Sequence, residues 1–216
     1  MSVRKTISDS KGFFHNEFPY VIPSIYRKVV DEYLVELNLL SNQANFKIDG
    51  IFSYGLTNSF STFTEGYQPK EHQNMILTSL CKACDVDYSK INAFGKAIRA
   101  FPKANSAEEF ISNINLKNSE SIEGIPLKQL IGKDNYYSRM HAIGIYELIN
   151  NKQIDGVKEE EIVEKSSCIA KEIGYNKDRV TKDLSQYRNN LSRIKEAFEL
   201  LKVASDETKR RIKDKE

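Results

Sequence analysis

The sequence predicts an all-α protein, a multi-helix bundle followed by a long C-terminal helix with coiled-coil character. Two observations lead to this prediction. Apolar residues recur at three- and four-residue steps in most segments, as they do on one face of a helix. Alternating apolar and polar stretches are short, and no Asn-Gly or Asp-Gly pair joins two apolar runs as in a β-hairpin. We therefore expect a helical bundle domain over residues 1–175 and a C-terminal helix over 176–216, packed partly on the body and partly projecting.

The composition indicates a soluble globular chain. Its 216 residues are 40% hydrophobic and 29% charged, with a formal net charge of +2. This small charge argues against a chain that binds polyanions over its whole surface. Three Cys residues are too few for a disulfide framework and suit a reducing compartment. We expect no targeting segment and no transmembrane segment, because no apolar run approaches the roughly 20 residues needed to cross a bilayer.

Four helices are expected in the first half of the chain. Ser24, Asp49 and Asp87 stand where an N-cap is expected, since each can accept a hydrogen bond from the first turn of a helix. Gly66 ends the second helix, and Pro69 prevents its continuation. The expected ranges are 24–40, 49–66, 70–84 and 87–101.

The second half begins with weaker signals. Ser106 opens a capping-box pattern for a short helix that ends near Ile114. Residues 115–134 carry no period, so we expect a loop with one short turn. Two further helices are expected over 135–150 and 158–173, the latter closed by Gly174.

The last helix is the most distinctive element. Asn176 is its expected N-cap, and residues 177–213 contain neither Pro nor Gly. Its apolar residues step alternately by four and three, as at the a and d positions of a coiled coil. This seam consists of Val180, Leu184, Tyr187, Leu191, Ile194, Phe198 and Leu201. A helix of this length reaches roughly 55 Å, which exceeds the width of a domain of this size.

The cysteines and histidines that could serve in redox chemistry or metal binding are better explained by structural roles. Cys81 and Cys84 form a C-x-x-C pair, but at the C-terminal end of a helix, where the dipole disfavours a thiolate. We interpret them as two small residues facing the core. The three histidines, His15, His72 and His141, lack metal-ligand spacing, so each is expected to be exposed or singly hydrogen-bonded.

Known catalytic motifs are absent from the sequence. It contains no phosphate-binding glycine loop, no dinucleotide fingerprint and no nucleophile elbow. We therefore predict no catalytic residues, no cofactor and no metal, and a protein that is not an enzyme.

The C-terminal segment is more basic than the rest of the chain. Residues 177–216 hold 12 basic and 8 acidic residues, whereas the remainder holds 20 and 22. Such a helix suits an acidic protein surface, anionic lipid heads or nucleic acid, although interspersed acidic residues dilute the field. No aromatic platform for stacked bases accompanies it, so no nucleic acid is expected. The candidate partner-binding residues are Arg188, Arg193, Lys195, Lys209, Arg210, Arg211 and Lys213.

Four blocks of the sequence resemble the thylakoid formation protein family, also called the photosystem II biogenesis protein family. They are VRKTISDSK at 3–11, SIYRKVVDEYLVELNLL at 24–40, FTEGYQP at 63–69 and DRVTKDLSQYRNNL at 178–191. The resemblance covers nearly the whole chain, and the match is poorest between residues 101 and 134. The plant members' transit peptide is missing, which favours a cyanobacterial member.

The resemblance implies an all-α accessory factor without enzymatic activity. Family members are linked to thylakoid biogenesis, to photosystem II assembly and repair, and to the stability of FtsH-type membrane proteases. It implies partners among membrane-bound complexes, namely these proteases and photosystem II intermediates. The implied location is the cytoplasmic side of the thylakoid membrane, as a peripheral protein, or the cytoplasm of a cyanobacterium.

Three alternatives from other classes remain open on the sequence. A basic helix that binds nucleic acid would show steep salt dependence. A redox or metal protein would depend on Cys81 and Cys84. A self-associating coiled coil would sediment as a dimer.

Overall fold

A computed structural model describes residues 4–101, 107–116, 120–132, 135–150 and 158–213. Residues 107, 108, 111, 115, 116 and 201–213 are described by their backbone alone. Over these ranges the chain is almost entirely helical, which confirms the all-α prediction. The helices are α1 (Ile7–Glu17), α2 (Ser24–Ser41), α3 (Gly50–Phe63), α4 (Glu71–Ala83), α5 (Tyr88–Arg99), α6 (Ala107–Leu116), α7 (Leu127–Leu130), α8 (Arg139–Asn150), α9 (Glu159–Ile173) and α10 (Lys177–Lys213). The strands β1 (Ser121–Ile122) and β2 (Ile125–Pro126) form a two-stranded antiparallel sheet.

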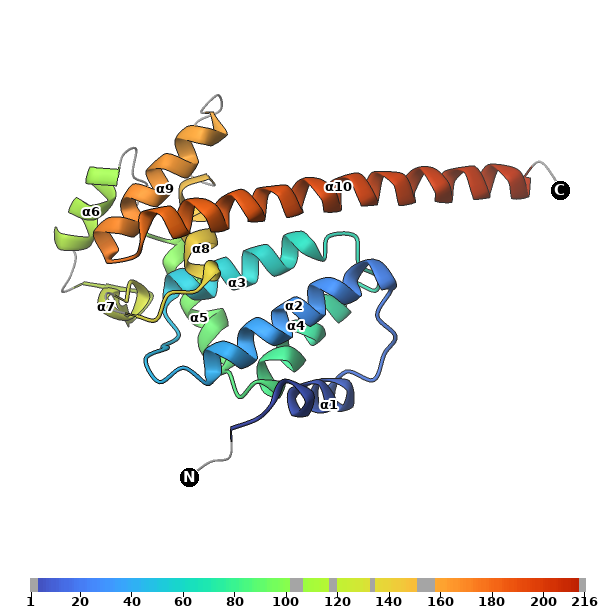
Figure 1. Ribbon diagram of the computed structural model, residues 1–216, viewed down its shortest axis with the longest axis horizontal. Helices are drawn as coiled ribbons and strands as arrows, with labels where there is room; N and C mark the ends of the chain where they lie inside the picture. The colour runs from blue at the N-terminus through green and yellow to red at the C-terminus, as the bar shows by residue number, and fades with distance from the viewer. Residues whose placement is uncertain (1–3, 102–106, 117–119, 133–134, 151–157, 214–216) are drawn as a thin grey trace.

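Helix α3 lies at the centre of the fold (Figure 1). It packs most extensively against α8 and α5, and α10 crosses the same region while packing on α8 and α9. Helices α1, α2 and α4 contact one another on the other side of the body. The far end of α10 extends beyond all of these helices, so the molecule has a compact body and one projecting arm (Figure 1).

Two glycines allow α3 and α8 to cross at very short distance. A Cβ on Gly55 of α3 would lie 1.9 Å from the Met140 carbonyl oxygen, and one on Gly144 of α8 would lie 2.1 Å from the Ile51 carbonyl oxygen. Both of these neighbours are backbone atoms, which cannot turn aside as a side chain can. Only glycine therefore fits at either position, and the two helices are locked at this crossing.

The helix caps expected from the sequence are largely confirmed. The side chains of Asp49, Asp87 and Asn176 each accept a hydrogen bond from the backbone N–H three residues on, at 2.8, 3.0 and 2.9 Å. Gly174 ends α9 with a φ of +108°, in the left-handed region that glycine adopts without strain. The Ser106 capping box lies outside the described residues.

Two expected helix starts are wrong. Ser24 is the first residue of α2 and not its cap, because the Pro23 carbonyl already accepts hydrogen bonds from the N–H groups of Tyr26 and Arg27. The helix expected from residue 135 begins only at Arg139. The side chain of Asn135 is bonded to the backbone of another segment, which holds the chain out of helical geometry here.

Two elements are missing from the sequence-based prediction. Helix α1 begins with a capping box in which Thr6 and Asp9 exchange hydrogen bonds, a T-x-x-D pattern that the sequence does show. The hairpin of β1 and β2 lies within the stretch expected to be a loop. Its turn consists of Glu123 and Gly124, both with positive φ, and glutamate is rare in this conformation. The usual Asn-Gly or Asp-Gly signal was therefore absent.

The α3–α8 crossing generates a test of stability. We expect Gly144→Ala to lower the free energy of unfolding by about 3 kcal/mol or more, because the methyl group can only be accommodated by moving backbone. Gly12→Ala is the matched control, since nothing lies within 4 Å of the added Cβ in α1. It should stabilise the protein by up to about 1 kcal/mol through helix propensity. Urea denaturation measures both, and equal stability of the two variants would refute the close crossing.

Candidate functional site

Helix α10 is built into the core along its first half. Val180, Leu184 and Tyr187 are buried, and three further seam residues are partly buried against the same core: Leu191, Ile194 and Phe198. The side chain of Leu201, the last seam residue, is not described. Over its described side chains the seam therefore packs on this chain's own body.

Arg188 is held within the chain. Its guanidinium donates to the carboxylate of Glu159 on α9 at 2.5 Å and lies 3.8 Å from that of Glu160. Its side chain is only 27% exposed. This candidate partner-binding residue therefore joins α10 to the start of α9.

Arg193 and Lys195 lie on different sides of α10. Arg193 lines a groove between α10 and α2. Lys195 lines a shallow hollow on the α9 side of the helix, together with Arg188 and Glu159. The side chains of Lys209, Arg210, Arg211 and Lys213 are not described, although the helix backbone continues to Lys213. The structure thus separates Arg193 from Arg188 and Lys195.

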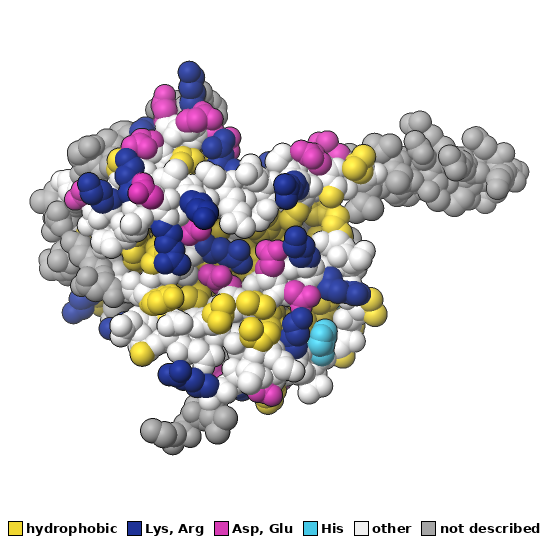
Figure 2. Space-filling model, viewed as in Figure 1, with side chains coloured by type: hydrophobic (Ala, Val, Ile, Leu, Met, Phe, Trp, Pro, Cys, Tyr) yellow, Lys and Arg dark blue, Asp and Glu magenta, His cyan; other side chains and the backbone are white. Residues whose placement is uncertain are grey.

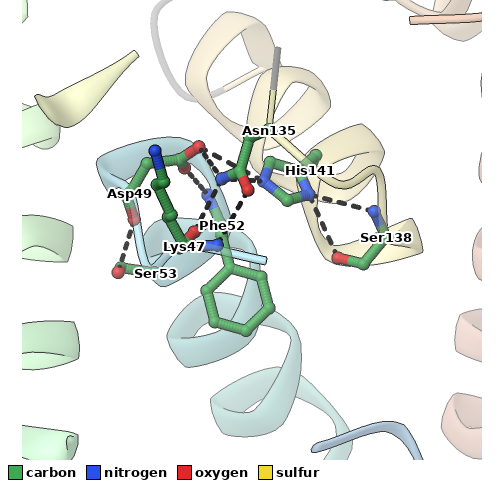
Figure 3. A network of polar contacts seen from close by, with 7 residues as sticks. All are labelled: Lys47, Asp49, Phe52, Ser53, Asn135, Ser138 and His141. Carbon is green, nitrogen blue, oxygen red and sulfur yellow. Dashed lines mark hydrogen bonds and ion pairs between the residues drawn. The ribbon is translucent and has the colours of Figure 1, made fainter. Parts of the chain in front are cut away.

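A polar network joins the start of α3 to the segment before α8 (Figure 3). It is buried at Asp49, Ser138 and His141, half-buried at Asn135 and exposed at Lys47. The Asn135 amide donates to Asp49 Oδ2 at 2.7 Å and to the Lys47 carbonyl at 2.6 Å, and its oxygen accepts from the Lys47 N–H at 2.9 Å. The other oxygen of Asp49 accepts from the Phe52 N–H. One amide side chain therefore pairs both with a backbone segment and with a buried helix cap.

His141 belongs to this network, so the expectation for this residue is wrong. It is fully buried, its Nδ1 accepts from the Ser138 N–H at 3.1 Å, and its Nε2 lies 3.3 Å from Asp49 Oδ2. Because Nδ1 is an acceptor, the proton of the neutral ring is on Nε2 and points at Asp49. The contact with Asp49 could not be predicted from the sequence, since Asp49 and His141 are far apart along the chain.

Ser138, His141 and Asp49 have the composition of a hydrolase triad but not its geometry. The Ser138 hydroxyl lies 3.1 Å from Nδ1, the same ring nitrogen that accepts the backbone N–H. Ser138 is 3% exposed and Asp49 is also 3% exposed, so no substrate carbonyl can reach this hydroxyl. We interpret the network as a structural clamp.

The C-x-x-C pair is buried, as the sequence indicated. Cys81 and Cys84 are at most 1% exposed, and Cys84 Sγ lies 3.5 Å from the Leu34 carbonyl oxygen. Burial raises the pKa of the Cys81 thiol to about 12 and that of Cys84 to about 11. Both sulfurs are therefore protonated and inert at neutral pH.

The part of the chain that the structure describes has no group of three His, Cys, Asp or Glu side chains that could hold a metal ion. Over the same residues no helix combines the length and the apolar character that crossing a membrane requires.

Comparison with known proteins decides the family. The family model described as "Thylakoid formation protein" matches residues 6–216. This chain belongs to the thylakoid formation protein family. Protein Thf1 of Prochlorococcus marinus strain NATL1A is 44% identical over 93% of this chain and 96% of its own length. Protein Thf1 of strain MIT 9211 is 39% identical over 100% of this chain and 96% of its own.

The fold of this thylakoid formation protein is shared with a solved structure. The structure of Psb29 at 1.55 Å matches with a TM-score of 0.78 and 27% identity, covering 96% of this chain and 98% of that one. Family membership supports a role in thylakoid formation and photosystem II biogenesis. The relatives are named for thylakoid formation and not for an enzymatic activity.

The polar network generates a second test. Asn135→Ala removes a donor to the buried Asp49 carboxylate and the partner of the exposed Lys47 N–H and carbonyl, which water can replace, so we expect a loss of about 1–3 kcal/mol in unfolding free energy. Asn42→Ala is the matched control, because Asn42 donates one hydrogen bond, to the Asn38 carbonyl near the end of α2. It should cost no more than about 1 kcal/mol. Thermal and urea unfolding measure both, and similar losses would contradict the clamp.

The buried thiols generate a third test. A chromogenic disulfide reagent at pH 8 should modify Cys168, which is partly exposed, and spare Cys81 and Cys84 until urea unfolds the chain. An unfolded thiol ionises near pH 9, and the folded thiols ionise only near 11 and 12. Burial of the two thiols therefore stabilises the fold fully below about pH 9, and this contribution is lost as the pH rises through 11 to 12. Rapid labelling of all three thiols in the native protein would refute this.

Proposed function

We propose that this protein is a non-enzymatic accessory factor of thylakoid membrane biogenesis and photosystem II assembly and repair. In this proposal it binds FtsH-type membrane protease complexes and stabilises one of their assembly states. It acts as a peripheral protein at the cytoplasmic side of the thylakoid membrane. The names of its relatives support the process, and the FtsH-type partner is the one that the family resemblance implies.

The observation that supports a binding role is the shape of α10. Its described side chains pack on the body as far as Phe198, and the helix backbone then continues to Lys213, beyond the other helices (Figure 1). These last 15 residues span roughly 22 Å at 1.5 Å per residue. An isolated helix of this length is marginal in water, so a partner surface is the natural source of its stability.

The basic character of this arm suggests how it recognises the partner. Its sequence carries Lys209, Arg210, Arg211 and Lys213 near the end. Of the candidates nearer the body, Arg188 is already paired with α9, whereas Arg193 and Lys195 have no ion pair among the described residues. The proposed contact surface therefore consists of Arg193, Lys195 and the basic end of α10. Binding to one assembly state more tightly than to others is sufficient to stabilise it, and no chemical step is needed.

Co-purification from mildly solubilised photosynthetic membranes tests the proposal. Deletion of all of α10 is unsuitable, because Val180, Leu184 and Tyr187 belong to the core. The test variants are a truncation of residues 201–216 and a full-length chain with Gln at Lys209, Arg210, Arg211 and Lys213. We expect FtsH-type subunits or photosystem II intermediates to co-purify with the intact protein and to fall at least about tenfold with both variants.

A matched control removes four exposed charges elsewhere. It carries Gln at Lys96, Lys128, Lys158 and Lys171, which lie on or next to other helices and are exposed. This control should retain the membrane complexes, and all three variants should keep the thermal stability of the parent. Equal retrieval by every variant would show that the arm does not make the contact. Retrieval of no membrane complex by the intact protein would refute the proposed function.

A further inference from the structure

A groove lies between α2 and α10 on the face shown in Figure 2, where apolar side chains are visible between charged ones. Helix α2 forms one wall, α10 forms the other, and the end of α3 with the first turns of α8 forms the floor. Helices α2 and α10 also contact each other through the rings of Tyr26 and Phe198, whose centroids are 5.7 Å apart. The groove is therefore a shaped recess on the body and is separate from the projecting arm.

Much of the groove lining is apolar. It includes Val29 and Tyr33 of α2, Phe63 of α3, Met140 and Ile143 of α8, and Ile194 of α10. The cavity here measures about 170 Å³. A cavity of about 150 Å³ with similar lining holds a benzene molecule. The recess thus has room for one aromatic or branched apolar side chain.

The groove is lined by three basic side chains, Lys28, Arg139 and Arg193, and two acidic ones, Glu32 and Asp183, which is an excess of one positive charge. Glu32 is paired with Lys28, and the Asp183 carboxylate accepts a hydrogen bond from the Tyr137 hydroxyl. The guanidinium of Arg193 has no hydrogen bond or ion pair with any described residue. Arg139 faces a carboxylate only through Nε, at 3.3 Å, and this nitrogen makes no well-aligned hydrogen bond.

These features define the chemistry of an occupant. Two arginines with spare donors favour carboxylates, which guanidinium groups bind through paired hydrogen bonds. Both walls are helices whose backbone groups are already paired, so they offer no edge to which an extended strand could add. A helix satisfies its own backbone and can place an apolar side chain in the cavity with acidic residues one turn to either side.

We propose that the α2–α10 groove is a docking site for an acidic amphipathic helix of a protein partner. The helix buries one apolar side chain in the cavity and pairs its carboxylates with Arg139 and Arg193. This inference rests on the proposed function, since the helix would belong to the membrane complex that the protein stabilises. It adds a second contact on the body to the one made by the arm.

A tryptophan-containing peptide tests the groove, because the chain itself has no Trp and contributes no tryptophan fluorescence. The probe is a 15-residue alanine-based helix with a central Trp and Glu three and four residues to either side. A companion peptide carries Lys in place of Glu. With the full chain, we expect a saturable blue shift at micromolar concentrations for the Glu peptide and at least about tenfold weaker binding of the Lys peptide.

Charge reversal locates the binding site. Arg193→Glu should weaken the Glu peptide at least about fivefold and strengthen the Lys peptide. This arginine has no hydrogen bond or ion pair with a described residue, so the variant should fold normally. Lys96→Glu on α5 is the control with the same final charge, and it should leave both affinities unchanged. Equal binding of the two peptides, or equal effects of the two variants, would overturn the inference.

Two further outcomes separate this inference from the proposed function. If membrane complexes co-purify with the protein but the Glu peptide does not bind, the groove inference fails and the proposed function stands. If the peptide binds as expected but no membrane complex is retrieved, the groove is supported and the proposed function fails. Concentration-dependent dimerisation that Arg193→Glu abolishes would assign the groove to a second copy of this chain, and would overturn a partner helix.

Discussion

The structure depends on the contact of two helix backbones at Gly55 and Gly144. Because α3 and α8 touch without intervening side chains, their crossing position is fixed by the chain itself and cannot adjust by changing rotamers. Helix α5 packs on α3, α9 packs on α8, and α10 packs on α8 and α9. The positions of α5, α9 and α10 therefore all depend on the backbone contact between α3 and α8.

The polar clamp at Asn135 restricts the rotation of α3 and α8 about their point of contact. Two helices that touch at one point can still rotate about it, and Asn135 prevents this by tying the segment before α8 to the segment before α3. Arg139, the first residue of α8, lies four residues further on and lines the α2–α10 groove. The clamp at Asn135 and the groove that Arg139 lines are therefore adjacent along the chain, at the start of α8.

The sequence predicts local structure well and long-range polar contacts poorly. The caps at Asp49, Asp87 and Asn176 depend on neighbours three residues away, so their patterns are visible in the chain. The seam of α10 predicts which side chains turn inward, but it does not say whether they meet another chain or this one. His141 has a local partner in Ser138, but its partner Asp49 lies on a distant segment, and the close contact at Gly55 exists only after folding. Glu123 adopts a turn conformation that its residue type rarely takes, so the hairpin had no usual signal.

Helix α10 is one uninterrupted helix from the core residue Val180 to Lys213. Its length therefore determines the direction in which the residues at its end face. Each residue of an α-helix advances the chain by about 1.5 Å and turns it by about 100°. One residue gained or lost beyond Phe198 would leave the body unchanged and rotate everything after it by more than a quarter of a turn. The number of residues between the groove and the basic end therefore specifies the direction in which that end faces relative to the body.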